Sequence, residues 1–314
     1  MPTLSLYITS VLIWGSTWYA IKLQLGIVAP EVSVAYRFAI AAVLLLLFCV
    51  IRRKNMRYSL VEHSWMAVLG FFLFCSNYAV FYVATGYLTS GLVAVVFSTV
   101  VFWNIFFARI LFGTAISIRV VFSTFLGTGG LALVFWPEIA NLQSDGDVMH
   151  GLTLCIIATV LASLGNITSG RNQRKGLPVL QSNAYGMAYG AAFTALYALA
   201  AGLDFNWDPS PAYLGSLIYL AIFGSILAFG AYLTLLGRIG AGKAAYAAVL
   251  FPVVALTMSV FLEGYMFTPL AGLGVILVLG GNVIALSKIR TVKPQSQDAP
   301  KDAQTEPVLS PKSD

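Results

Sequence analysis

The feature that most constrains this chain is a succession of apolar segments, each about as long as a helix that crosses a bilayer. Roughly 20 helical residues span the hydrocarbon core, and a lipid-exposed strand would leave its backbone groups unpaired. The segments lie near residues 4–24, 32–51, 65–84, 89–111, 118–136, 151–170, 180–201, 212–235, 243–262 and 267–288. The pattern predicts an all-α membrane protein with ten transmembrane helices.

The composition agrees with this prediction. Of 314 residues, 59% are hydrophobic and 10% are charged, whereas soluble domains are about 45–50% apolar and about 25% charged. This composition excludes an ordinary soluble enzyme, a nucleic-acid-binding module and a secreted disulfide scaffold. Cys49, Cys75 and Cys155 lie inside apolar segments without paired spacing, so we expect buried thiols that form no disulfide and bind no metal. We expect no cofactor.

The distribution of charge predicts the orientation of the chain. Lysine and arginine gather in cytoplasmic loops of membrane proteins. The basic residues of alternate loops are Arg52, Arg53, Lys54, Arg57, Arg109, Arg119, Arg171, Arg174, Lys175, Arg238 and Lys243. The acidic residues near the other ends are Glu31, Glu138, Asp145, Asp147, Asp204, Asp208 and Glu263. We therefore expect both termini inside a multi-pass protein of the inner (plasma) membrane. The net charge of +6 then reflects topology, and no nucleic acid partner is expected.

The chain also repeats itself. Residues 86–130 align without a gap on residues 237–281 when shifted by 151 positions, and Gly86, Gly91 and Gly129 each meet a glycine. Because each half holds an odd number of predicted spans, the second half must be inverted relative to the first. Inverted repeats place a substrate site near the bilayer midplane, between halves that give alternating access. The repeat thus predicts a carrier for a small-molecule substrate.

The repeat and the composition divide the chain into four parts. We expect a first five-helix repeat, an external linker, a second five-helix repeat and a disordered cytoplasmic tail. These parts cover residues 1–136, 137–150, 151–290 and 291–314, respectively. The last part is rich in Pro, Lys, Asp, Gln and Ser, a composition that does not bury a core.

Several short motifs are shared with a known family. They are Trp14-Gly15-Ser16, Pro30 with Tyr36-Arg37-Phe38, Asn77, Tyr87-Leu88-Thr89-Ser90-Gly91, and Pro252 followed by Leu262-Glu263-Gly264. On these residues the chain resembles the drug/metabolite transporter superfamily, specifically EamA-type permeases. The resemblance implies two five-helix halves and export or exchange of small metabolites, often amino acids, through a central cavity. It departs from the family pattern at Val101 and Phe112, where a proline and a glutamate are common.

Aromatic residues mark one candidate lining for such a cavity. Trp14 and Trp18 are four residues apart, as are Tyr78 and Tyr82, so each pair shares a helix face. Trp103 follows Thr99 in the same way. Rings with a few hydroxyl groups suit a substrate that has an apolar side chain and a polar head. The alternative is that these rings face lipid or the membrane interface.

Polar residues within the spans form a second set of candidates. Burying them unpaired is costly, so they bind either substrate or other helices. The set comprises Asn77, Ser98, Thr99, Asn104, Ser163 and Asn166. In the second half, Tyr232 and Tyr246 are the corresponding candidates at mid-helix or at the cavity mouth.

Charged residues within the spans are few. Arg37 lies one to two turns inside the second predicted helix, and such a charge meets either a partner or a substrate anion. We favour an ion pair or backbone anchor at the outer face, with Glu31 and Lys22 nearby. Glu263 ends the ninth span and is expected to anchor it at the interface. No aspartate or glutamate lies in the middle of a predicted span, so proton antiport through such a carboxylate is not indicated.

Two glycine motifs have structural interpretations. Gly237 to Lys243 match G-x-x-x-x-G-K, but Ala244 follows where a phosphate loop needs Ser or Thr. We interpret that segment as a tight cytoplasmic turn. Gly186-x-x-x-Gly190 predicts close helix packing, within the chain or in a dimer.

We predict a secondary transporter that exports or exchanges small amphipathic metabolites, most readily amino acids. Nucleosides, sugars and cationic drugs are alternative substrates, and a channel is a further alternative. An intramembrane enzyme is disfavoured, because His63 and His150 lie in loops and the spans hold neither a catalytic motif nor a carboxylate pair.

Overall fold

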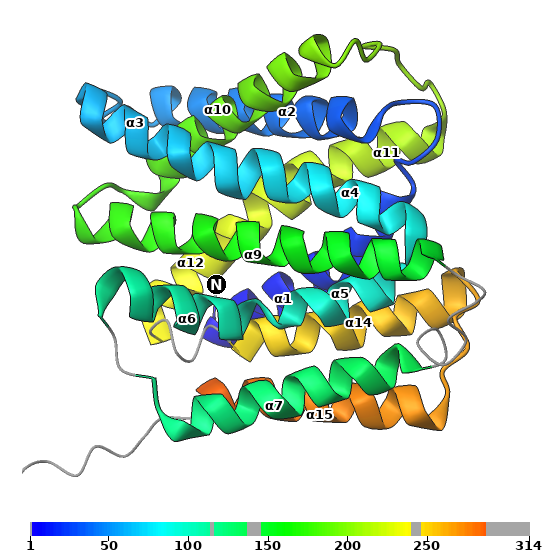
Figure 1. Cartoon of the computed structure of the whole chain (residues 1–314). Coiled ribbons are helices and arrows are strands. Elements are labelled where there is room, and N and C mark those ends of the chain that lie inside the picture. Colours follow the sequence, from blue (N-terminus) through cyan, green and yellow to red (C-terminus); the bar gives the residue numbers. More distant parts are fainter. Residues whose placement is uncertain (1, 114–115, 137–145, 240–245, 287–314) are drawn as a thin grey trace, which may run out of the picture.

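The computed structural model describes residues 2–113, 116–136, 146–239 and 246–286. Within these ranges the chain is helical and has no strand. The helices lie roughly side by side along one direction (Figure 1). Those that are long and apolar enough to cross a membrane are Thr3–Lys22, Pro30–Ile51, Leu60–Tyr87, Ser90–Leu111, Gly146–Arg174 and Pro211–Tyr232. Shorter apolar helices cover Ile118–Val134, Leu250–Leu262 and Pro269–Ala285.

The helices of the first half follow the predicted spans closely. They are α1 (Thr3–Lys22), α2 (Pro30–Ile51), α3 (Leu60–Leu69), the π-helix η1 (Gly70–Ser76), α4 (Asn77–Tyr87), α5 (Ser90–Ser98), α6 (Val100–Phe112) and α7 (Ile118–Val134). Pro30 begins α2 at a position where its missing N–H costs no bond. Ser59 and Glu62 form a reciprocal capping box at the start of α3.

The second half contains a comparable series. Its helices are α9 (Gly146–Arg174), α10 (Val179–Ala200), α11 (Pro211–Tyr219), the π-helix η2 (Leu220–Leu227), α12 (Ala228–Ile239), α14 (Tyr246–Leu262) and α15 (Pro269–Leu286). Helix α9 is longer at both ends than the sixth predicted span, and its first residues belong to the predicted linker. The predicted tail and residues 240–243 of the predicted turn lie outside the described residues.

One long helix in each half is interrupted by a π-helical segment, α3–η1–α4 in the first half and α11–η2–α12 in the second. A π-helical segment replaces α-helix over Gly70–Ser76 in one half and over Leu220–Leu227 in the other. In each, a serine hydroxyl donates to the carbonyl five residues earlier, from Ser76 to Phe71 at 2.8 Å and from Ser225 to Leu220 at 2.9 Å. The two segments fall at corresponding places in the sequence, which fits the repeat architecture. π-Helical turns widen a helix and recur at functional sites.

Glycines allow the helices to approach closely. A Cβ at Gly70 would lie 2.5 Å from the carbonyl oxygen of Gly186, and one at Gly190 would lie 2.6 Å from Cβ of Phe74. The Gly186-x-x-x-Gly190 face of α10 is therefore occupied within the chain, by α3 and η1. Small residues serve this purpose in membranes, where the hydrophobic effect does not drive helices together.

A second glycine contact joins α7 to α15, the pair at the bottom of Figure 1. A Cβ at Gly130 would lie 2.5 Å from the carbonyl oxygen of Gly274, and the reverse distance is also 2.5 Å. The two backbones thus touch at reciprocal positions. This contact is a direct packing of one half of the chain on the other.

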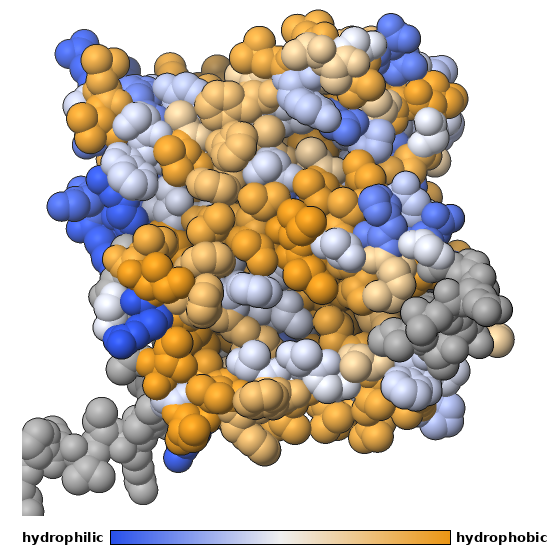
Figure 2. All heavy atoms as spheres, viewed as in Figure 1, coloured by the Kyte–Doolittle hydropathy of each residue, from blue (hydrophilic) through white to orange (hydrophobic). Residues whose placement is uncertain are grey.

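The surface of the bundle is consistent with a lipid environment. In Figure 2 hydrophobic residues cover most of the visible face, and hydrophilic residues gather toward the ends of the helices. Large apolar side chains are widely exposed, among them Phe125, Phe261 and Ile276. A soluble monomer rarely exposes so much contiguous apolar surface.

Replacing Gly130 with alanine should destabilise the protein. The new methyl group would overlap the Gly274 carbonyl, and overpacking of this kind costs about 1–3 kcal/mol. The matched control is Gly129→Ala, because a Cβ at Gly129 has nothing within 4 Å. Thermal unfolding in detergent measures both variants. Equal unfolding midpoints would contradict the close α7–α15 contact.

Candidate functional site

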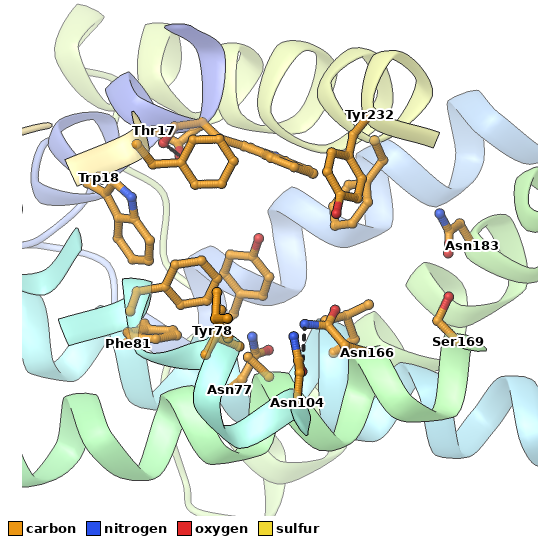
Figure 3. Close-up of a pocket in the computed structure, with 18 of the residues that line it drawn as sticks. Thr17, Trp18, Asn77, Tyr78, Phe81, Asn104, Asn166, Ser169, Asn183 and Tyr232 are labelled. Carbon is orange, nitrogen blue, oxygen red and sulfur yellow. Dashed lines mark hydrogen bonds between the residues drawn. The ribbon is translucent and has the colours of Figure 1, made fainter. Parts of the chain in front are cut away.

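A cavity of about 350 Å³ lies among helices from both halves of the chain (Figure 3). Its walls come from α1, η1, α4, α5, α6, α9, α10, α12 and α14. The residues that line it are Trp14, Thr17, Trp18, Ile21, Leu73, Asn77, Tyr78, Phe81, Phe97, Val100, Val101, Asn104, Ala162, Asn166, Ser169, Gly170, Gln173, Asn183, Phe229, Tyr232 and Phe251. The volume suits a small metabolite.

Aromatic rings make up much of the wall. Trp14 packs against Phe229, Tyr232 and Phe251 at centroid separations of 5.1, 5.1 and 5.3 Å. Its indole N–H donates to the carbonyl oxygen of Gly224 at 3.1 Å, which fixes the orientation of the ring. Edge-to-face packing stabilises such clusters beyond their buried area. The result is a rigid apolar wall built around α1.

Polar side chains form the opposite wall in Figure 3. The Oδ1 atom of Asn104 accepts hydrogen bonds from Ser163 at 2.8 Å and from Asn166 at 3.4 Å. This network joins α6 to α9. Part of the predicted polar set therefore bonds between helices, while Asn104 and Asn166 also line the cavity.

Two polar atoms in the wall have no hydrogen-bond partner among the described residues. They are the indole N–H of Trp18 and Oδ1 of Asn77, both buried. An unpaired buried donor or acceptor is expensive, and each such group calls for an explanation. Both side chains belong to the cavity wall, so a small shift of the wall would expose one donor and one acceptor to the cavity.

The cavity is closed at one end. Trp18, Ile21 and Phe81 form that end and are almost fully buried. Toward the other end Ser169 and Gln173, from the last turns of α9, are partly exposed. Figure 3 shows Trp18 and Phe81 at one side of the cavity and Ser169 and Asn183 at the other. The accessible end therefore lies on the side where α9 ends and α10 begins.

Near the closed end, Glu263 links three helices. Its carboxylate is 2.8 Å from Nζ of Lys22 at the end of α1. It also accepts hydrogen bonds from the backbone N–H of Ser90, at 3.0 Å, and from the Ser90 hydroxyl at the start of α5. Burial by itself raises the pKa of the Glu263 carboxyl, but these partners outweigh burial and the pKa lies below its ordinary value. Glu263 follows α14 directly, so it is an anchor between helices.

The structure brings together seven of the residues predicted from sequence. They line the cavity and are Trp14, Trp18, Asn77, Tyr78, Asn104, Asn166 and Tyr232. Ser163 lies behind the wall, where it donates to Asn104. The side chain of Tyr246 lies outside the described part of the chain.

Four predicted residues lie elsewhere. Tyr82 is fully buried and donates to Gln24 at 2.7 Å. Ser98 and Thr99 each donate to a carbonyl one turn earlier in the chain, and α5 gives way to α6 at Thr99. Trp103 packs beside Phe106 and Phe107 on α6. A helix stripe alone did not reveal which face each helix turns inward.

Sequence reasoning missed several polar residues of the wall. Thr17, Ser169, Gln173 and Asn183 line the cavity but were not proposed for it. Asn166, Ser169 and Gln173 are three and then four residues apart, which is one face of a helix. That spacing was a usable signal. It was overlooked because Gln173 lies beyond the predicted end of its span.

The predicted ion pair of Arg37 is absent from the described residues. Its side chain is 1% exposed, and the ion pair recorded there joins Lys22 and Glu263 instead. Arg37 donates to the hydroxyl oxygens of Ser225 at 3.2 Å and of Tyr82 at 3.5 Å. The interpretation of Arg37 as part of an outer-face ion pair was therefore wrong. The helix turns this side chain inward, toward η2.

Metal binding has no support in the described part of the chain. No group of three or more His, Cys, Asp or Glu residues there could hold an ion. The arrangement instead offers an enclosed space with an aromatic wall, hydrogen-bonding groups and one accessible end. A space of this kind has room and polar groups for a small solute.

Relatives with similar sequences include proteins that are named as transporters. The uncharacterized inner membrane transporter YedA of Escherichia coli (strain K12) is 26% identical over 307 residues, which are 95% of this chain and 97% of that protein. The uncharacterized transporter YoaV of Bacillus subtilis (strain 168) is 22% identical, covering 79% of this chain and 84% of YoaV. Protein PagO of Salmonella typhimurium is 20% identical over 83% of this chain and 84% of PagO.

The fold is also known among solved structures. One crystal structure covers 90% of this chain, and 96% of its own chain is matched, with a TM-score of 0.65 and 17% sequence identity. The model of the EamA-like transporter family matches residues 1–136 and 149–287. The helices, the apolar surface and the relatives identify a multi-pass protein of the inner membrane. The chain belongs to the EamA-like transporter family.

Proposed function

We propose that this transporter is a secondary carrier that exports or exchanges small amphipathic metabolites, with amino acids as the favoured substrates. The observation that carries the proposal is the cavity, in which an aromatic wall faces amide and hydroxyl groups. A free amino acid has a side chain for the first and a polar head for the second. The amide groups of Asn77, Asn104 and Asn166 in the wall can bond either a carboxylate or an ammonium group.

We also propose ten spans in two inverted halves, with both termini in the cytoplasm. The paired helices support this topology. If the halves are equivalent, α2 corresponds to α10, α5 to α14 and α7 to α15, and each of these pairs packs together. Equivalent helices that lie beside a two-fold axis in the membrane plane pack on each other, so these contacts fit the arrangement of inverted-repeat carriers. The placement of η1 and η2 supports the same relation.

In this orientation the described conformation opens inward. The accessible end of the cavity lies beside Arg171 and Arg174 of α9, on the predicted cytoplasmic side. The outer end is closed by Trp18, Ile21 and Phe81, and Glu263 holds α1, α5 and α14 together near it. Alternating access would require release of this contact. Release would break the ion pair of Glu263 with Lys22 and its hydrogen bonds with Ser90.

Asn77→Ala should weaken transport without unfolding the protein. The change removes an acceptor that has no other partner in the described chain, so the loss falls on the substrate. One hydrogen bond contributes about 1–1.5 kcal/mol, which corresponds to roughly a tenfold higher KM. Counterflow of labelled phenylalanine and alanine in liposomes measures it.

The control for Asn77→Ala is Ser98→Ala. Ser98 is buried and donates to the Val95 carbonyl of its own helix, outside the cavity. Its loss should leave KM unchanged. If wild-type protein that elutes as a folded species exchanges no amino acid, the amino-acid proposal is wrong, and nucleosides, sugars and cationic drugs are tested next.

Glu263→Gln should favour opening of the outer end, because it removes the negative charge that pairs with Lys22. A cysteine at Ile21, in a chain without native cysteines, reports access from outside by reaction with an impermeant maleimide. Labelling should rise several-fold in Glu263→Gln and stay low in the control Glu31→Gln. Labelling in Glu263→Gln that stays as low as in the parent chain would contradict the proposal that Glu263 holds the outer end closed.

The same reporter gives a pH dependence. The folded-state pKa of Glu263 is lowered from 4.5, so its stabilising contribution is complete above that value. It is lost only as the pH falls through the lowered pKa. The labelling rate of the Ile21 cysteine, divided by that of the exposed Asp204→Cys to remove the pH dependence of the thiolate itself, should therefore be constant from neutral pH down to about pH 5 and rise below it. A rise near neutral pH would assign closure to another group.

Orientation can be tested with single cysteines in a chain without native cysteines. Asn55→Cys, in the loop before α3, should react with an impermeant maleimide only after the cells are permeabilised. Asp204→Cys, in the loop before α11, should react in intact cells. Both positions are exposed. The opposite pattern would reverse the proposed topology.

A further inference from the structure

The most unusual side chain of this protein is Arg37. It begins the third turn of α2, about 10 Å along the helix from Pro30, and is 1% exposed. A guanidinium group stays charged at any pH that a cell meets. Intramembrane charges of this kind are costly and are kept where they serve a function.

The partners of Arg37 in the described structure are all neutral. Its Nε donates to Ser225 and its Nη1 donates to Tyr82. Its guanidinium carbon lies 4.5 Å from the ring centroid of Tyr78 and 5.1 Å from that of Phe38. These contacts solvate the cation and leave its charge uncompensated.

Arg37 lies directly behind the cavity wall. Tyr78 lines the cavity and its ring also contacts the guanidinium. On the other side, a Cβ at Gly224 would touch both Thr17, at 2.9 Å, and Nη2 of Arg37, at 3.4 Å. Thr17 lines the cavity as well. One layer of side chains therefore separates the cation from the solute space.

No residue that lines the cavity, among those the structure describes, carries a charge. The potential inside the cavity is then governed by the nearest uncompensated charge. In a low-dielectric interior a charge acts over many ångströms with little screening. Lys22 does not compete for this role, because Glu263 neutralises it. Arg171 and Arg174, in the last turn of α9, lie at the accessible end of the cavity, whereas Arg37 contacts Tyr78 in its wall.

The charge is present in only one half of the repeat. Ala35-Tyr36 corresponds to Ala184-Tyr185, so Arg37 corresponds to Gly186. Gly186 is covered by Phe74 and Leu69, which would lie 3.1 and 3.3 Å from a Cβ there. At this position the second half has a glycine at a close helix contact, and the first half has a buried charged side chain. The repeat by itself does not require an arginine here.

We propose that Arg37 sets the charge selectivity of the cavity, so that the cavity accepts solutes that carry a carboxylate and rejects amines that lack one. This inference rests on the proposed carrier function and names the class of substrate. The carboxylate lies nearest the Tyr78 wall, and the aromatic cluster around Trp14 contacts the apolar side chain. The cationic drugs considered as alternatives are then excluded by charge.

The test measures the potential in the cavity without any transport. In a chain without native cysteines, Asn77→Cys places a thiol in the wall beside Tyr78. Its reaction rates with an anionic and a cationic methanethiosulfonate of similar size are compared with the rates at the exposed Asn55→Cys. The anionic-to-cationic rate ratio should be at least a hundredfold higher at position 77 than at position 55, because one charge acting over about 10 Å at an effective dielectric constant of about 20 speeds the anion and slows the cation by roughly tenfold each.

Arg37 variants then assign the effect. Arg37→Gln should reduce the ratio at position 77 to that at position 55, and Arg37→Lys should preserve it. The matched control is Arg109→Gln, because Arg109 is exposed at the end of α6 and its guanidinium donates to the Gly113 carbonyl in the following loop. A ratio that Arg37→Gln leaves unchanged would mean that Arg37 only joins α2 to η2. If Arg37→Gln does not fold, equal wild-type ratios at positions 77 and 55 would by themselves overturn the proposal.

Competition in counterflow separates this inference from the carrier proposal. Phenylalanine and 3-phenylpropionate carry a carboxylate, whereas phenylalanine amide and phenethylamine do not. The first two should compete for exchange, and the amines should be at least tenfold weaker. Equal competition by the amines would overturn the charge selectivity but leave the carrier intact. If no compound is exchanged but the rate ratio at position 77 is high, the proposal that amino acids are the substrates is wrong and the role of Arg37 stands.

Discussion

The structure depends on one constraint, which is that a backbone within hydrocarbon must bond to itself. Helices meet that constraint, and glycines then let the helices approach until their backbones touch, as Gly130 and Gly274 do. Close approach at some places allows separation at others. The cavity lies where aromatic and amide side chains, instead of glycines, face each other across α1, α4, α6 and α9.

Polar side chains within the membrane also need hydrogen-bond partners, and whether they find one depends on how close the next helix lies. Where a partner helix is close, they pair, as Asn104 does with Ser163. Trp18 and Asn77, in the cavity wall, keep atoms that have no hydrogen-bond partner among the described residues. The two π-helical segments contribute to this difference. At η2 the widened turn presents Ser225 to Arg37, whereas at η1 the corresponding face is packed against glycines of α10.

The two charged positions make the halves unequal. Arg37 and Glu263 have no charged counterpart in the other half, where Gly186 and Phe112 occupy the corresponding positions. One charge lies behind the cavity and the other joins three helices near its closed end. Proposed functions of selectivity and closure are thus assigned to single residues. A symmetrical scaffold carries an asymmetrical site.

The sequence by itself determined the helical membrane fold, the helix ranges and a third of the cavity lining, because span length and helical periodicity are local properties. Among the residues it suggested, Trp14, Asn77 and Tyr232 line the cavity. Only the tertiary structure decided which helix face turns inward, since an apolar stripe serves lipid and protein contacts equally. It therefore moved Trp103 out of the cavity, brought in Gln173 and Asn183, and showed that Arg37 faces neutral partners and not the expected carboxylate.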